Sequence, residues 1–382
     1  MSDARGPLAG LRIVEIAGLG PVPHAALILA ELGAEVVRID RLPGTAGFGS
    51  LPAGLGRSRP SVAVDLTTPD GVEVILRLLE GADVLLEGMR PGRMERLGLG
   101  PEVVRERAPR VIYARMTGWG QDGPMAQQAG HDITYAALSG ALHLTGGTGR
   151  PTPPANLLAD FGGGSTYLVI GVLAALIARG STGAGQVVDA AMVDGAALNL
   201  TIIHGLLGLG LWQAERGVNL LDGGAPFYDT YACADGAFIA VGALEPQFHA
   251  ELCRVLGVDC PDRHLDPSTW PGQREAFTAA FRSRTRAEWL AAFEGVDACV
   301  APVLTPGEAA AHPHSVARGS YAATSTGSLP RVAPRFSETP GLDPGPERLA
   351  GANTTAYLLG RGFTAEQIAD LLARGVLGQP ST

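Results

Sequence analysis

The chain has 382 residues, of which 46% are hydrophobic and 18% charged, and its net charge is −9. This length is enough for two or more domains with substantial cores, and the apolar content excludes a disordered chain. The excess of acidic residues argues against a general binder of nucleic acids or anionic membranes. All 29 basic residues are arginine, which excludes Schiff-base chemistry and a Walker-type phosphate loop, since both need a lysine amine.

The four cysteines contain no CxxC pair, so the sequence predicts neither a disulfide framework nor a zinc ribbon. The histidines, including His312 and His314, lack neighbours of a metal-binding kind, and we expect no metal. The N-terminus does not resemble a secretion signal, and the apolar run from Tyr167 to Ala178 is too short to span a bilayer. We therefore expect a cytoplasmic protein that is not bound to a membrane.

Short β-branched runs alternate with helical patterns in the first half of the chain. The predicted strands are LRIVEI (11–16), EVVRID (35–40), SVAVDL (61–66), DVLLEG (83–88) and RVIYARMTG (110–118). Such alternation predicts a parallel sheet with helices on both faces and right-handed crossovers. The turn after the first strand, AGLGPVPH, has Pro23 where the dinucleotide-binding GxGxxG motif has its third glycine, which argues against NAD or FAD.

The sequence of the second half of the chain predicts an organisation that differs from the parallel sheet of the first half. Buried helices are expected over 132–143 and 163–178, and one long helix from about Ala191 to Arg216. The alternating segment 227–243 around Asp235-Gly236 predicts a β-hairpin. Helices near 246–257, 273–282 and 285–294 and a strand over 298–304 complete a smaller α+β unit, and a last helix is expected over 363–375.

Three residues stand out as candidates for acid–base chemistry. His131 follows Gly130 at a predicted helix N-terminus, where it could transfer protons or merely cap the helix. Asp160 lies before three glycines in an otherwise uncharged stretch, as a helix N-cap or as a functional acid. Asn156 could orient that carboxyl group or satisfy a turn. Glu245 lies between a predicted strand and a predicted helix, where it is either a functional acid or an ordinary acidic residue in the first turn of the helix.

Arginines gather at two predicted strand ends. One group is Arg38, Arg41, Arg57 and Arg59; the other is Arg90, Arg93 and Arg96. The carboxyl ends of parallel strands are where ligands bind, and arginine suits phosphate oxygens. A solvated basic surface explains the same pattern equally well.

Several segments together resemble the alpha-methylacyl-CoA racemases of the class III CoA-transferase (CaiB/BaiF) superfamily. They include LLEGMRPGRMERLGLGPE, ARMTGWGQDGP, QQAGHDITY, NLLADFGGGS, GQVVDAAMVDG and GALEPQF. The resemblance implies a Rossmann-like large α/β domain over 1–190, completed by the tail 331–382. A linker helix over 191–222 and a small α+β domain over 223–330 follow, and two subunits interlock as a homodimer.

The resemblance also implies functional residues. His131 and Asp160 match the two acid/base residues, Glu245 the acid that partners the histidine, and Asn156 the amide beside the aspartate. The positions that match CoA-binding residues are Arg41, Val64, Asp65, Leu66, Thr67, Gly88, Met89, Arg90, Arg96, Gly130, His131, Asp132, Ile133, Thr134 and Tyr135. Thr67 stands where relatives often have a lysine, so the CoA phosphates would depend more on arginine.

The expected reaction is the interconversion of (2R)- and (2S)-2-methylacyl-CoA thioesters. His131 and Asp160 would remove and return the α-proton on opposite faces, and the enolate oxygen would lie near the helix start at Asp132. CoA is part of the substrate, so we expect no separate cofactor. The alternative is a CoA-transferase in which Asp160 is a covalent nucleophile. Relatives of that kind usually have an aromatic residue at the position of His131, which favours the racemase. A catalytically silent CoA-binding protein is a third interpretation.

Overall fold

The computed structural model describes residues 6–43, 54–324 and 327–380, and its contacts divide the chain into two compact units. The larger unit contains residues 1–139, 155–199 and 319–382, and the smaller contains 140–154 and 200–318. Residues 140–154 belong to the smaller unit because Arg216 donates hydrogen bonds to carbonyls of this segment, among them Gly147 O at 2.6 Å. The sequence had suggested boundaries at 190, 222 and 330.

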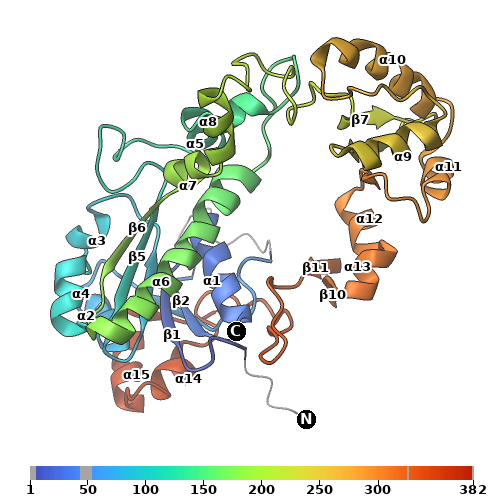
Figure 1. Ribbon diagram of the computed structural model, residues 1–382. Coiled ribbons are helices and arrows are strands. Elements are labelled where there is room, and N and C mark those ends of the chain that lie inside the picture. Colours follow the sequence, from blue (N-terminus) through green and yellow to red (C-terminus); the bar gives the residue numbers. More distant parts are fainter. Residues whose placement is uncertain (1–5, 44–53, 325–326, 381–382) are drawn as a thin grey trace. The chain divides into compact units, whose positions relative to one another are not determined.

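A seven-stranded sheet forms the centre of the larger unit (Figure 1). Its strands are β1 (Arg12–Ile16), β2 (Glu35–Asp40), β3 (Ser61–Val64), β4 (Val84–Glu87), β5 (Ile112–Thr117), β6 (Val187–Ala191) and β12 (Leu377–Gly378). The order is β12-β3-β2-β1-β4-β5-β6, and all neighbours are parallel except β12, which runs antiparallel to β3. The predicted α/β class with a Rossmann-like parallel sheet is confirmed. The order changes direction between β1 and β4, and ligands bind at such a point in sheets of this type.

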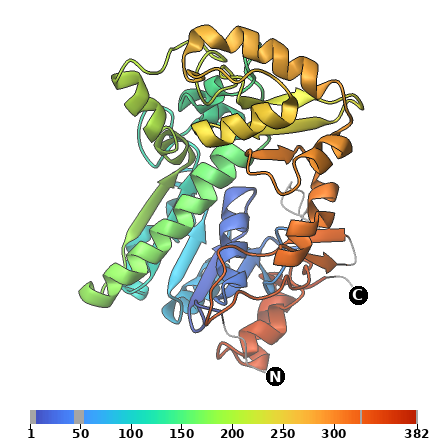
Figure 2. The same ribbon diagram turned by 45° about the vertical axis from the view of Figure 1, so that its right-hand side comes forward.

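Helices cover both faces of this sheet, as Figures 1 and 2 show. Helices α2 (Pro69–Glu80), α4 (Pro101–Arg107), α14 (Thr354–Leu359) and α15 (Ala365–Ala373) share one buried apolar cluster with Val14, Val37 and Val62 of the strands. Helices α1 (Pro21–Glu31) and α6 (Thr166–Thr182) pack together, α1 against β1, β2 and β4 and α6 against β5 and β6. Strands β1 to β5 are therefore buried from both sides, which explains their nearly continuous apolar sequences, whereas the edge strand β6 is partly exposed.

Two predicted helices have different forms in the structure. Instead of one helix over 132–143 there is α5 (Asp132–Leu138), followed after Gly140 (φ +87°) by a short 3-10 turn, Ala141–Leu144. The prediction of one long helix from Ala191 to Arg216 is also wrong. The structure has two separate short helices, α7 (Met192–Leu198) and α8 (Thr201–Gly208), and the chain after α8 forms turns that are not helical. Glycine lowers the helical preference of this segment, which contains Gly205, Gly208 and Gly210.

The smaller unit has its own core. Its three-stranded antiparallel sheet has the order β7 (Tyr228–Ala232), β8 (Phe238–Gly242), β9 (Val300–Pro302), with the predicted hairpin between β7 and β8. Phe227, Phe277, Phe281 and Trp289 are fully buried in its core. The helices of this part of the chain are α9 (Pro246–Leu256), α10 (Trp270–Phe281), α11 (Arg286–Ala292), α12 (Pro306–Ala311) and α13 (Pro313–Arg318).

The remaining elements belong to the larger unit. They are α3 (Arg93–Arg96), the π-helical segment Leu157–Ser165 and the hairpin of β10 (Tyr321–Thr324) and β11 (Gly327–Pro330). Among the described residues, one helical stretch, 157–182, has the length and apolar composition that could cross a membrane. It comprises the π-helical segment and α6, which packs on β5, β6 and α1.

Candidate active site

A cavity of about 1010 Å³ lies at the carboxyl edge of the large sheet. Its walls come from the residues that directly follow five parallel strands: 17–21 after β1, 41–42 after β2, 65–67 after β3, 88–91 after β4 and 118–119 after β5. The chain adds strands in one direction from β1 (β2, then β3) and in the opposite direction from β4 (β5, then β6). The loops after β1 and β4 therefore run to opposite sides and leave a crevice between them. The topology of the sheet thus produces the crevice.

Asp160 lines this cavity from the π-helical segment Leu157–Ser165, which continues directly into α6. The sequence had placed Asp160 before a helix, as a possible N-cap, and this is wrong because the helical backbone already begins at Leu157. Burial and the nearby carboxylate of Asp132 raise the pKa of Asp160 to about 6, and His131 opposes this rise. A carboxyl group with such a pKa can both accept and donate a proton near neutral pH.

His131 lines the same cavity and is the N-cap residue of α5. Its backbone N–H donates to Thr134 Oγ1 at 3.0 Å, and that hydroxyl donates to the His131 carbonyl at 2.8 Å. Two glycines make room for the ring of Tyr135 below it: a Cβ at Gly118 or Gly130 would lie only 2.1 or 2.4 Å from Tyr135 Cε1. These contacts fix the backbone that carries the imidazole while the imidazole itself stays exposed.

Asp132 joins the two candidate acid/base residues. Its side chain is buried, and Oδ1 accepts hydrogen bonds from the backbone N–H groups of Ala159 at 2.7 Å and Asp160 at 2.8 Å. The residue after His131 thereby holds the backbone of Asp160, 28 positions away. The sequence had suggested Asp132 as the helix start and as a CoA-binding position, and this clamp on Asp160 was not predicted. A single acid directly after the candidate histidine was the only available signal.

Four arginines line the cavity: Arg41, Arg90, Arg93 and Arg96. Three of them, Arg41, Arg90 and Arg96, were predicted to bind CoA; they are exposed and form no ion pair with a carboxylate of the described residues. Their guanidinium groups are thus available to an anionic ligand. Thr67, in the place where a lysine was expected, donates from its hydroxyl to Asp65 Oδ1 at 2.6 Å and closes a turn after β3.

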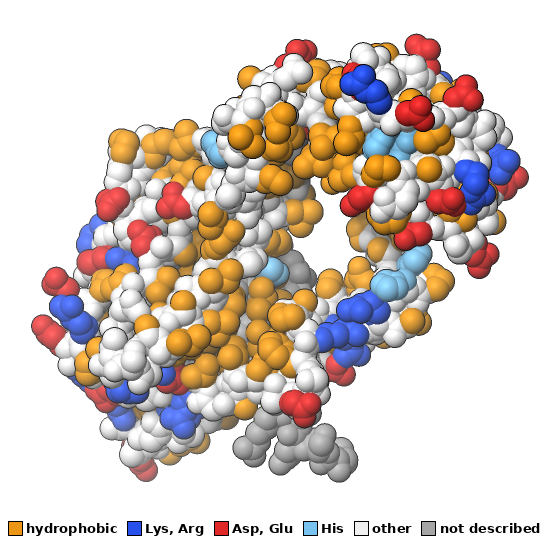
Figure 3. All heavy atoms as spheres, viewed as in Figure 1, with side chains coloured by type: hydrophobic (Ala, Val, Ile, Leu, Met, Phe, Trp, Pro, Cys, Tyr) orange, Lys and Arg blue, Asp and Glu red, His pale blue; other side chains and the backbone are white. Residues whose placement is uncertain are grey.

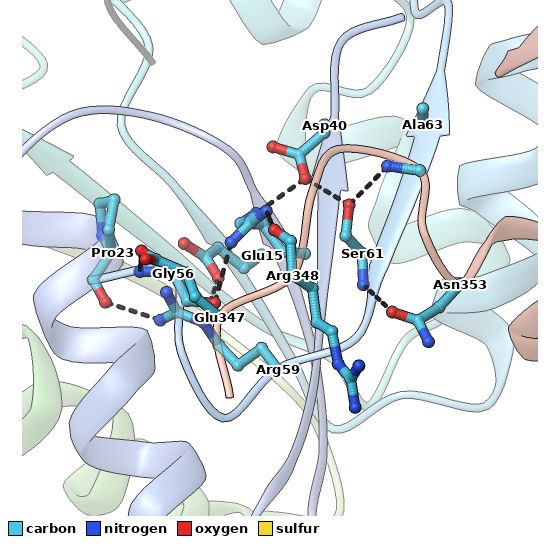
Figure 4. A network of polar contacts seen from close by, with 12 residues as sticks. Glu15, Pro23, Asp40, Gly56, Arg59, Ser61, Ala63, Glu347, Arg348 and Asn353 are labelled. Atoms are coloured by element: carbon cyan, nitrogen blue, oxygen red, sulfur yellow. Dashed lines mark hydrogen bonds and ion pairs between the residues drawn. The ribbon is translucent and has the colours of Figure 1, made fainter. Parts of the chain in front are cut away.

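The other arginines of the first group have structural roles, which corrects both interpretations of that cluster. Arg38 pairs with Asp40 at 2.7 Å, Arg57 with Glu31 at 2.6 Å and Arg59 with Glu15 at 3.4 Å. Figure 4 shows Arg59 reaching from the loop before β3 to the carbonyl of Pro23 at the start of α1, where Nη1 donates at 2.6 Å. Burial raises the pKa of Glu15, and Arg59 opposes this effect. The pairs of Arg57 and Arg59 connect the loop before β3 to α1 and β1, and the pair of Arg38 lies within β2.

The remaining predicted residues divide into three groups. Those that line the cavity are Val64, Asp65, Leu66, Gly88, Met89, Gly130 and Tyr135. Asn156, Asp132, Ile133 and Thr134 are not among the lining residues, although all four lie in the segments that carry His131 and Asp160. Glu245 is exposed, at the N-cap of α9 in the smaller unit. Its role, like that of Asn156, stays a prediction.

The cavity also has walls that the sequence analysis did not select. They include the turn 17–21, Trp119 and Met192. Gly20 has a positive φ of +65°, and a Cβ there would lie 3.3 Å from Asp160 Oδ2. The positive φ favours glycine here, and any larger side chain would also press on the carboxyl group of Asp160.

Comparison with known proteins agrees with this architecture. Residues 8–353 match the model of CoA-transferase family III. The chain is 46% identical to mouse alpha-methylacyl-CoA racemase, over 95% of this chain and 96% of the mouse protein, and 45% identical to the human one over the same shares. A CaiB/BaiF family protein from Brucella suis superposes with a TM-score of 0.79 at 26% identity, covering 94% of this chain and 100% of that structure. The chain belongs to CoA-transferase family III.

Proposed function

We propose that this protein is a racemase that interconverts (2R)- and (2S)-2-methylacyl-CoA thioesters. The observation that carries the proposal is that His131 and Asp160 line one cavity, where burial and Asp132 raise the pKa of Asp160 to about 6. Identity of 45–46% to alpha-methylacyl-CoA racemases over nearly the full chain supports the same activity. Inversion of a carbon needs a proton acceptor on one face and a donor on the other, and this pair supplies both.

One proton shared by the pair is enough for both directions. With neutral His131 and protonated Asp160, the imidazole takes the α-proton, and the C–H electron pair moves into the enolate. Asp160 then donates its proton to the opposite face of the α-carbon. The enzyme is left with an imidazolium and a carboxylate, which is the starting state for the reverse reaction. We place the enolate oxygen beside the first backbone N–H groups of α5, and no separate cofactor is needed.

The CoA part of the substrate would lie along the strand ends. Arg41, Arg90 and Arg96 are exposed cations on the cavity wall, and guanidinium groups bind phosphate oxygens through paired hydrogen bonds. Because Thr67 has no charge, the phosphate interaction at this edge would depend on arginine, and Arg93 also lines the cavity. Glu245 would stabilise the imidazolium form of the histidine, and Asn156 would orient the Asp160 carboxyl group.

We also propose a homodimer. Large apolar side chains are exposed on both compact units, and Figure 3 shows such side chains gathered over α6. Ile177 on α6 is 79% exposed, and Ile202 on α8 is 60% exposed. Exposed apolar side chains that gather on one face are typical of subunit interfaces. Light scattering should give twice the mass of one chain, and a monomer at micromolar concentration would contradict the proposal.

The test of the activity is α-proton exchange in D₂O with each enantiomer of a 2-methylacyl-CoA. Wild-type protein should incorporate deuterium and invert the centre, because the enolate is reprotonated from groups that exchange with solvent. Asp160→Asn and His131→Asn should each reduce inversion by about 10²–10⁴-fold. Glu102→Gln, which changes an exposed acid of α4, serves as the matched control.

Two outcomes would contradict the racemase. Complete retention of protium would exclude proton abstraction. A hydroxylamine-sensitive covalent adduct on Asp160, formed with acyl-CoA and consumed by an acceptor acid, would assign the protein to CoA transfer instead, with Asp160 as the nucleophile.

A further inference from the structure

Three potential metal ligands meet in the smaller unit, among residues that do not line the cavity. His249 and Cys253 are four residues apart on α9 and therefore lie on the same face of the helix. After α9 ends, Gly257 adopts a left-handed conformation (φ +69°), and the chain brings Cys260 back to this face. One ligand atom from each residue lies within 4.8 Å of the other two.

The distances suit a tetrahedral metal site. Bond lengths of about 2.3 Å to sulfur and 2.0–2.1 Å to nitrogen place two such ligands about 3.6 Å apart at tetrahedral angles. Here His249 Nδ1 lies 3.4 Å from Cys260 Sγ and 3.9 Å from Cys253 Sγ. Cys253 Sγ also lies 3.8 Å from Nε2, so its side chain would have to rotate toward Nδ1 before both sulfur atoms and this nitrogen could bind one ion.

The imidazole of His249 is held in the orientation that a metal ligand needs. His249 Nε2 lies 2.9 Å from Gln273 Oε1, and the amide of Gln273 in turn donates from Nε2 to Thr269 Oγ1 at 3.1 Å. Because Gln273 offers its oxygen, Nε2 carries the proton, and Nδ1 is left with a lone pair beside Cys260 Sγ. His264 stacks on the ring with a centroid distance of 4.4 Å. Metal-bound histidines are typically fixed by such a hydrogen bond from the other ring nitrogen.

We propose that His249, Cys253 and Cys260 bind a zinc ion, with the fourth position open to solvent beside exposed Cys260. Two thiolates and an imidazole form a donor set that Zn²⁺ favours over harder cations. No metal was expected from the sequence because the histidines lack neighbours of a metal-binding kind and no CxxC pair is present, whereas these ligands have the spacing H-x₃-C-x₆-C. The bound ion would fasten the end of α9 to the segment that follows it.

The experiment uses the full-length reduced protein with Co²⁺ as a spectroscopic probe and Zn²⁺ as competitor. One Co²⁺ per chain should give sulfur-to-cobalt charge-transfer absorption and the visible bands of a tetrahedral site, and Zn²⁺ should abolish both. Cys260→Ser, at an exposed position that does not endanger folding, should weaken Zn²⁺ binding at least about tenfold. Cys299→Ser, at another exposed cysteine, is the matched control and should bind as wild type.

Gln273 tests the orientation of the imidazole separately. Gln273→Leu should weaken Zn²⁺ binding about 10–100-fold, and Gln273→Glu, which keeps an acceptor oxygen, should restore most of it. Absence of thiolate charge transfer, or equal Zn²⁺ affinity of wild type and Cys260→Ser, would overturn the proposal. A Cys253–Cys260 disulfide in protein that does not bind zinc would also overturn it and assign a redox pair. None of these measurements uses racemase activity.

Discussion

The substitution Asp132→Asn tests how the protein sets the proton affinity of Asp160. Asp132 Oδ1 accepts from the N–H groups of Ala159 and Asp160, while its buried Oδ2 has no hydrogen-bond partner among the described residues. Asparagine keeps the volume and the accepting oxygen but removes the negative charge. Because that charge is one cause of the raised pKa of Asp160, the substitution should lower this pKa.

Burial, the larger cause, remains in the variant, so we expect the pKa of Asp160 to fall from about 6 but to stay above its ordinary value. A fall of about one pH unit would make the protonated form of Asp160 roughly tenfold rarer at pH 7. The state with protonated Asp160 and neutral His131 becomes roughly tenfold rarer, and kcat/KM should fall by up to that factor. Both directions must fall together, because the equilibrium constant of the reaction fixes their ratio.

The assay is a carboxyl ¹³C NMR titration combined with kcat/KM at pH 7 for each enantiomer. The resonance of Asp160 is assigned by its absence from the Asp160→Asn spectrum. Glu102→Gln is the control for loss of a distant carboxylate and should leave the titration unchanged. An unchanged or raised pKa of Asp160 in Asp132→Asn would refute the electrostatic reasoning. A lowered pKa with unchanged kcat/KM would refute the role of protonated Asp160 in catalysis.

Three further substitutions test the surroundings of the cavity. Arg59→Met should lower the free energy of unfolding at pH 8 by about 3–5 kcal/mol, because Glu15 stays buried without its cation. In urea denaturation, the double variant with Glu15→Gln should recover most of this loss. If the losses of the two single variants add, the pairing is contradicted. Arg90→Ala should raise the KM for acyl-CoA roughly tenfold with little change in kcat, since a hydrogen bond to a charged group contributes about 1.5–3 kcal/mol. The KM of the variant should also depend less on salt concentration. A change confined to kcat would exclude a role of Arg90 in CoA binding. Gly118→Ala should displace the ring of Tyr135 and destabilise the protein by about 1–3 kcal/mol in thermal unfolding, and an unchanged melting temperature would argue against the tight packing at this point.

Local patterns determined much of the architecture. The five strands predicted in the first half each contain a strand of the large sheet, from β1 to β5, because continuous β-branched runs between helical patterns have few other stable arrangements. The same patterns place Gly88 and Arg90 directly after β4, and the carboxyl ends of parallel strands form one edge. The position of a ligand cavity at this edge therefore followed from the sequence.

Only the tertiary structure decided which charged and polar groups meet. Arg59 and Arg90 look alike in the sequence, yet one is buried against Glu15 and the other is free to meet a ligand, because long-range packing supplies the partner of the first. Asp132 holds the backbone of Asp160 across 28 positions, and Cys260 meets His249 only because the chain turns at Gly257. A linear sequence lists such groups without their distances, and electrostatic effects depend on distance and burial. The sequence by itself therefore selected the chemical groups, and the fold decided which of them act together.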